Sequence, residues 1–165
     1  MYTKEQIWNS FAKEINLIKH VAERLPVGSE THKPTEQQRT TLELLHYLGG
    51  MGAGILGSIA VNNLDIFSEQ LKKSEGVTIE TFPQIMDAQE KTMKDFFDSI
   101  TDEQMNEEVT LWGGWKQTRA LFILDCLKMM TAYKMQLFLY AKAAGNHSIG
   151  TSNLWAGMDM PAPAE

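Results

Sequence analysis

The segment 118–145 constrains the fold more than any other part of the sequence, because it is long and apolar around most of a helical circumference. At about 100° per residue, one row of this helix combines aromatic rings with polar atoms, and we expect it to face the core. The row consists of Phe122, Met129, Tyr133, Gln136 and Tyr140. A separate polar sector contains Lys128, Lys134 and Lys142. Such a helix is typical of the interior of a helical bundle.

Three further segments show the 3.6-residue periodicity of amphipathic helices. The first begins at a potential capping box formed by Thr3 and Gln6, the second begins near Pro34 and runs to about Val61, and the third begins near Thr81. No segment has the alternation of a strand. We therefore expect an all-α four-helix bundle as a single domain over 1–165. A short extra helical piece should follow the second helix, and an extended C-terminal tail, largely irregular from about 146, should follow the last.

The second helix contains five glycines between Gly49 and Gly57. Each costs about 1 kcal/mol relative to alanine in a helix interior, so tertiary structure has to offset the loss. Close approach of a neighbouring helix would explain them, as would a kink or room for a ligand. The uncharged stretch 44–64 is also long enough to raise the question of a membrane span, but glycines and polar residues dilute its hydrophobicity. We expect a buried helix and no membrane partner.

Charge and cysteine content narrow the class of protein further. The formal charge of −6 and the absence of a Lys/Arg run argue against a nucleic-acid surface. A lone cysteine, Cys126, cannot form an internal disulfide, and the first twenty residues lack the apolar centre of a signal peptide. These features predict a cytoplasmic protein.

The run 133–145, YKMQLFLYAKAAG, resembles the end of the last bundle helix in the DinB-like family. The family motif reads approximately His-Arg-Gly-Gln-Leu-x-x-Tyr-Leu-Arg-x-x-Gly. Four positions are identical and a fifth keeps its charge: Gln136, Leu137, Tyr140 and Gly145, and then Lys142. The resemblance implies a four-helix bundle, and DinB-like proteins are often homodimers.

The same resemblance implies a metal site, but with altered ligands. In DinB-like proteins a divalent metal, often zinc or nickel, is held by one histidine of the second helix and two histidines, four residues apart, of the last. His46 matches the second-helix position, whereas Met129 and Tyr133 stand at the last-helix positions. A thioether and a protonated phenol are poor zinc ligands. We therefore expect no bound metal or other cofactor.

Three functions remain open from the sequence, which assigns no reaction. The first is a metal-free bundle with a small-molecule pocket near His46, lined also by Asp125, Met129, Tyr133 and Gln136. The second is a metal-dependent thiol S-transferase or hydrolase in which replacement ligands join His46, with Asp125, His32 and His147 as candidates. The third is a structural bundle that forms a homodimer through exposed apolar surface. A non-functional role for His46 is a core histidine that bonds to Tyr133 or Gln136.

Overall fold

The computed structural model describes residues 3–111 and 113–159, and its helices confirm the expected bundle. In chain order the elements are α1 (Lys4–Ala22), α2 (Thr41–Val61), α3 (Asp65–Lys72), α4 (Phe82–Ser99), α5 (Asp102–Asn106), β1 (Glu108–Leu111), β2 (Trp115–Thr118), α6 (Arg119–Ala143) and α7 (Thr151–Ala156). The long helices α1, α2, α4 and α6 enclose one apolar core.

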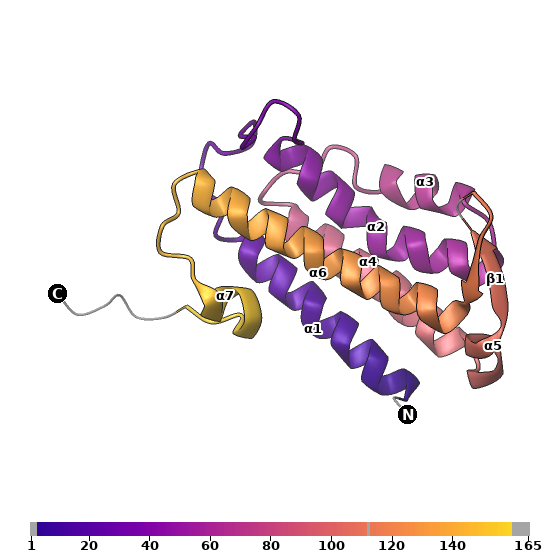
Figure 1. Cartoon of the computed structure of the whole chain (residues 1–165). Helices are drawn as coiled ribbons and strands as arrows, with labels where there is room; N and C mark the ends of the chain where they lie inside the picture. Colours follow the sequence, from indigo (N-terminus) through magenta and orange to yellow (C-terminus); the bar gives the residue numbers. More distant parts are fainter. Residues whose placement is uncertain (1–2, 112, 160–165) are drawn as a thin grey trace.

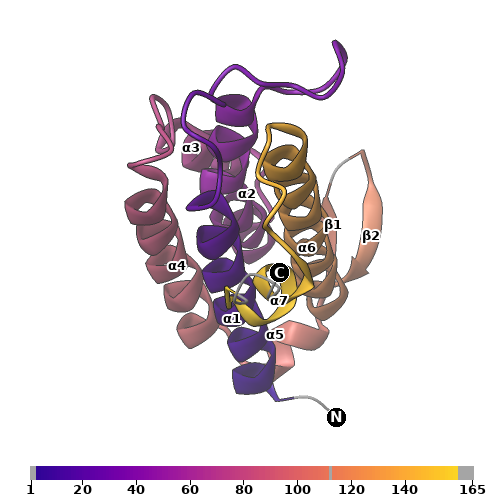
Figure 2. The same ribbon diagram turned by 90° about the vertical axis from the view of Figure 1, so that its left-hand side faces the viewer.

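Around the bundle the order of packed neighbours is α1, α4, α2 and α6. Figure 1 shows that α1 and α6 run in one direction and that α2 and α4 run in the opposite direction. The short helix α3 packs on the outside of α2, and the loop after it returns the chain to the start of α4. Figure 2 shows the β1–β2 hairpin beside α6 and α7 next to α1.

Side-chain capping marks the starts of α1 and α2. The capping box of Thr3 and Gln6 at the start of α1 is confirmed. By contrast, α2 begins at Thr41 and not near Pro34, because Thr40 and Glu43 form a second capping box there. In this box the hydroxyl accepts from a helix N–H, and the carboxylate accepts from the N–H of the cap residue. A helix start at a proline would leave these two N–H groups without a partner.

The glycines of α2 allow its neighbours to approach closely, which confirms the first of the explanations considered above. A Cβ on Gly50 would lie 2.7 Å from the carbonyl oxygen of Gln70 and 2.8 Å from Cα of Leu71, in α3. α2 is long and apolar enough to cross a membrane by composition, but 72% of its most apolar window is buried inside the fold. It is therefore the core helix of the bundle.

Gln89 of α4 joins its helix to the backbone of α2. Its Oε1 accepts from the N–H groups of Gly52 (2.8 Å) and Ala53 (3.2 Å), and its Nε2 donates to the carbonyl of Leu48 (2.8 Å). In a regular α-helix the Gly52 N–H donates to the Leu48 carbonyl, because the two residues are four positions apart. The side-chain amide thus satisfies backbone groups in the middle of α2 and holds α4 against it.

Lys134 departs from the predicted pattern of α6. It was assigned to a polar sector, yet its side chain is 1% exposed and its Nζ lies 3.0 Å from Oε1 of Glu14 in α1. The indole of Trp155 in α7 covers the same ammonium, with its ring centroid 4.6 Å away. The assignment was wrong because α1 and α7 bury this side of α6.

The C-terminal segment is more ordered than the sequence predicted. Helix α7 interrupts the part expected to be irregular from about 146, and its Leu154 is buried. Arg24 donates from Nε to Oδ1 of Asp159 at 2.6 Å, and Asn153 Nδ2 donates to the same oxygen at 2.7 Å. Asn153 Nδ2 also lies 3.2 Å from Nε2 of His20, which accepts when the ring is neutral. These bonds tie the segment to α1.

We expect this attachment to weaken as the pH falls below neutrality. Burial, with a further contribution from Arg24, lowers the pKa of His20 below 6.5. The stability that the neutral ring contributes is therefore present above that value and is lost as the pH falls through the lowered pKa. Asp159, whose pKa is about 2, stays ionised throughout. Hydrogen exchange of the α7 amides should therefore accelerate, relative to those of α4, between about pH 7.5 and 5. His20→Gln keeps an acceptor and should remove this pH dependence; an unchanged profile in that variant would refute the assignment to His20.

Candidate functional site

A cavity of about 360 Å³ lies between α2, α3, the hairpin and α6. Its lining is mostly aromatic or aliphatic, and we name it the aromatic cavity. The lining residues are Tyr47, Ile55, Phe67, Trp115, Phe122, Asp125, Cys126 and Met129. Trp115 and Met129 are 54% and 37% exposed, so they form the side of the cavity that meets solvent.

The rings of this cavity contact one another edge to face or at a tilt. The centroids of Tyr47 and Phe67 are 6.2 Å apart, and those of Trp115 and Phe122 are 5.4 Å apart. At one end, Tyr133 lies against Tyr47 with a centroid distance of 4.8 Å. Such arrangements are favourable for aromatic pairs, so the walls are held by ring packing as well as by the helices.

Charged groups occur only at the edges of the cavity, and they have partners. The carboxylate of Asp125 accepts from Gln117 Nε2 and from Lys128 Nζ, both at 2.9 Å. These hydrogen bonds, that of Gln117 first, lower the pKa of Asp125 and keep it ionised. The guanidinium of Arg39 lies 4.5 Å from the ring centroid of Tyr47 and 5.9 Å from that of Tyr133, where a cation–π interaction stabilises it.

The titratable groups inside the cavity are protonated at neutral pH. Burial, and after it the neighbouring Tyr133, raise the pKa of Tyr47 to about 12. Burial also raises the pKa of the Cys126 thiol, whose Sγ lies 3.9 Å from the carbonyl oxygen of Gly52. A neutral phenol and a neutral thiol are weak nucleophiles and weak metal ligands. The cavity therefore offers binding surface and no activated group.

The predicted site residues of α6 lie in one row, but only part of the row borders the cavity. Asp125 and Met129 line it, and Tyr133 packs on Tyr47 at its end. Gln136 lies further along α6, where its Nε2 donates to the hydroxyl of Tyr140 at 3.1 Å. This row was expected to face the core, but Met129, Tyr133 and Gln136 are only partly buried, because they lie at the edge between α6 and α2.

His46 lies away from these residues. Its Nδ1 is 3.2 Å from the hydroxyl of Ser74, in the turn after α3, and so the interpretation that it bonds to Tyr133 or Gln136 was wrong. The α2 residue that faces Tyr133 is its neighbour Tyr47, because one residue turns a helix by about 100°. Tyr47, Phe67 and Trp115 were not predicted as site residues. Tyr47 could have been found only by knowing how α2 is rotated.

The metal positions implied by the resemblance do not fit a zinc or nickel ion. His46 bonds to Ser74, and Met129 and Tyr133 offer only a thioether and a phenol. Among residues 3–111 and 113–159, no three His, Cys, Asp or Glu side chains are grouped so that they could hold an ion. His147 is exposed in the segment after α6.

These features define a four-helix bundle with a cavity between its second and last long helices. No model of a protein family matches the chain, and no curated protein matches it. Among solved structures, a DinB-like protein (YjoA) from Bacillus subtilis superposes with a TM-score of 0.70 at 21% sequence identity, over 85% of this chain and 92% of that one. The chain therefore has the fold of a DinB-like protein.

Proposed function

We propose that this chain is a metal-free DinB-like protein that binds a small, uncharged, largely apolar molecule in the aromatic cavity. The observation that carries the proposal is the cavity itself, with about 360 Å³ of space enclosed mainly by rings and aliphatic side chains. Small-molecule sites are typically apolar hollows of about 300–1,000 Å³ with few polar groups. The proposal keeps the function expected from the sequence but centres the site on Tyr47 instead of His46.

The charges around the cavity support a neutral ligand. Asp125 is already bonded to Gln117 and Lys128, and Arg39 is already placed over Tyr47. A charged ligand would have to displace these partners, whereas an apolar ring only has to replace water. Burial of apolar ligand surface contributes about 25 cal/mol per Å².

Closing the mouth of the cavity should abolish binding. In Met129→Trp the larger ring would occupy the space beside Trp115, and we expect affinity for the probe 1-naphthol, measured by isothermal titration, to fall at least about tenfold. Val61→Trp is the matched control, because Val61 is 63% exposed at the end of α2 and does not line the cavity. Equal affinity of the two variants, or no saturable binding by the parent protein, would contradict the proposal.

We propose further that two copies associate through the outer face of α6. Four exposed apolar side chains lie along this face: Leu121, Leu124, Met135 and Leu139. Residues 121 and 139 are eighteen positions apart, about five turns, so they project in the same direction. The row is nearly symmetric about position 130, so an antiparallel second copy would place Leu121 against Leu139 of its partner and Leu124 against Met135 of its partner.

Sedimentation tests this association. At micromolar concentration the parent protein should sediment as a dimer, and Leu124→Glu should sediment as a monomer because a charge would be buried without a partner. Val61→Glu, at an exposed position at the end of α2, is the control and should remain dimeric. A monomeric parent protein would rule out the dimer.

We place the protein in the cytoplasm, where an unpaired cysteine such as Cys126 stays reduced, and we propose no nucleic-acid or membrane partner.

A further inference from the structure

Asp125 is the residue through which the aromatic cavity can select a ligand by its polar groups. Among the described residues that line the cavity, it alone carries a charge. It lies in α6 three residues after Phe122 and four before Met129, so its carboxylate is on the same edge of the helix as two apolar walls. Its side chain is only 30% exposed. An acceptor that is partly withdrawn from solvent therefore lies beside the rings.

The carboxylate of Asp125 keeps unused acceptor capacity. An ionised carboxylate has about four acceptor sites on its two oxygens. Gln117 Nε2 donates to Oδ2 and Lys128 Nζ donates to Oδ1, so each oxygen receives one hydrogen bond. Neither donor lines the cavity, since Gln117 comes from β2 and Lys128 from the next turn of α6. Each oxygen therefore retains an acceptor site for a molecule in the cavity.

Two further polar groups of the lining have partners inside the protein. The side chain of Tyr47 is hydrogen-bonded to Tyr133, and the thiol of Cys126 donates weakly to the carbonyl of Gly52 at 3.9 Å. The indole of Trp115 can donate a hydrogen bond but cannot accept one. Asp125 is therefore the acceptor that a donor group of a bound molecule would meet.

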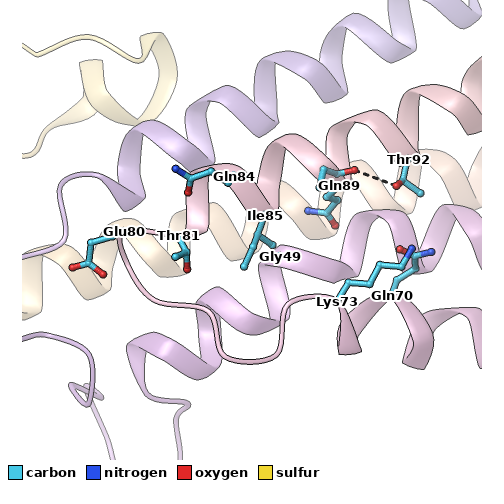
Figure 3. Close-up of a pocket in the computed structure, with 10 residues that line it drawn as sticks. Gly49, Gln70, Lys73, Glu80, Thr81, Gln84, Ile85, Gln89 and Thr92 are labelled. Carbon is cyan, nitrogen blue, oxygen red and sulfur yellow. Dashed lines mark hydrogen bonds between the residues drawn. The ribbon is translucent and has the colours of Figure 1, made fainter.

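A cavity of about 460 Å³ between α3 and α4 differs in this respect (Figure 3). The amide of Gln89 is bonded to the α2 backbone on both its oxygen and its nitrogen, and the hydroxyl of Thr92 donates to the carbonyl four residues before it. Its charged residues, Lys73 and Glu80, lie at opposite ends of the lining in Figure 3. The interior polar groups are already used, and we assign this cavity no ligand.

The charge of Asp125 determines which kind of donor it accepts. The hydrogen bond from Gln117, followed by that from Lys128, lowers the pKa of the carboxyl, so the group is ionised at neutral pH. It would repel a ligand carboxylate. A ligand ammonium would compete with Lys128 and would lose hydration on entering an apolar cavity. A neutral O–H or N–H group meets neither cost and forms a charge-assisted hydrogen bond.

We propose that the ligand of the aromatic cavity is an aromatic molecule with one neutral hydrogen-bond donor, such as a phenol or an indole, and that Asp125 accepts this donor. The inference rests on the proposed function, because it names the chemical class of ligand for the same cavity. Contacts with the surrounding rings favour an aromatic ligand body, and the hydrogen bond to Asp125 fixes its orientation. Asp125 is thus a specificity-determining residue.

Two probes that share one ring system test the proposal: 1-naphthol carries the donor, and 1-methoxynaphthalene lacks it. Asp125→Asn keeps the size of the side chain and removes its charge. By isothermal titration at neutral pH, we expect this variant to bind 1-naphthol at least about fivefold more weakly than the parent protein does. Its affinity for 1-methoxynaphthalene should change by less than about twofold.

Asp95→Asn is the matched control. Asp95 is exposed, pairs with a lysine of its own helix as Asp125 does, and does not line the cavity. This variant should bind both probes as the parent protein does. Two charged probes, 1-naphthoate and 1-naphthylmethylamine, should bind the parent protein more weakly than 1-naphthol.

The outcomes separate this inference from the proposed function. If neither 1-naphthol nor 1-methoxynaphthalene binds saturably, the proposed function fails and this inference fails with it. If both bind, but Asp125→Asn lowers the two affinities by the same factor or lowers neither, the cavity binds apolar molecules and Asp125 is not the acceptor. A charged probe that binds more tightly than 1-naphthol would overturn the choice of a neutral donor.

Discussion

Glu14→Leu is expected to lower the free energy of unfolding by about 3–5 kcal/mol, because it leaves a buried ammonium without a counter-ion. Lys134 is 1% exposed, and the two carboxylate oxygens of Glu14 lie 3.0 and 3.1 Å from its Nζ. The ring of Trp155 lies over the ammonium, which further separates it from solvent. Urea unfolding followed by far-UV circular dichroism measures the loss.

A second variant distinguishes loss of the ion pair from loss of packing. Glu14→Leu combined with Lys134→Met removes both charges, and we expect it to recover most of the stability, since apolar replacement of a buried pair is often neutral or better. Asp95→Leu, which breaks an exposed i,i+4 pair with Lys91, should cost less than about 1 kcal/mol. If the single variant Glu14→Leu were as stable as Asp95→Leu, the buried pair would contribute no more to the free energy of unfolding than the exposed pair does.

The same ion pair shows that helical periodicity alone does not predict which side chains are buried. Periodicity identified the four long helices, and the Thr3 capping box placed the start of α1 correctly. Periodicity within 118–145 could not indicate that α1 and α7 cover Lys134, because that depends on a partner 120 residues away. The expected inward row of α6 is confirmed at Phe122 and Tyr140, which are buried, whereas Met129, Tyr133 and Gln136 are only partly buried.

The candidate site was predictable to a similar extent. The sequence placed Asp125 and Met129 at the cavity, because both lie on one edge of a helix that is recognisable by itself. His46 was chosen by its position along α2, but the rotation of α2 turns Tyr47 toward α6. Phe67 comes from the short helix α3, whose apolar residues Ile66, Phe67 and Leu71 share one face, but the sequence does not indicate which helices that face packs against. The ring system depends on two elements outside the four long helices, α3 and β2, as well as on α2 and α6.

The contact between α3 and α2 positions one wall of the aromatic cavity, and Gly50→Ala should disrupt it. The added Cβ would lie 2.7 Å from the carbonyl oxygen of Gln70 and 2.8 Å from Cα of Leu71. Both atoms are backbone, so the clash can be relieved only by moving α3. Alanine favours the helix by about 1 kcal/mol, but overpacking against backbone costs more, and we expect a net loss of about 2–3 kcal/mol in urea unfolding.

Gly57→Ala is the matched comparison, since its Cβ would approach only the side chain of Ile66, with the nearest atom, Cγ2, at 2.6 Å. Rotation of that side chain can relieve the contact, so the loss should be less than half as large. Because α3 carries Phe67 into the aromatic cavity, Gly50→Ala should also weaken 1-naphthol binding. If Gly50→Ala were as stable as Gly57→Ala and bound 1-naphthol normally, the position of α3 would not control the site.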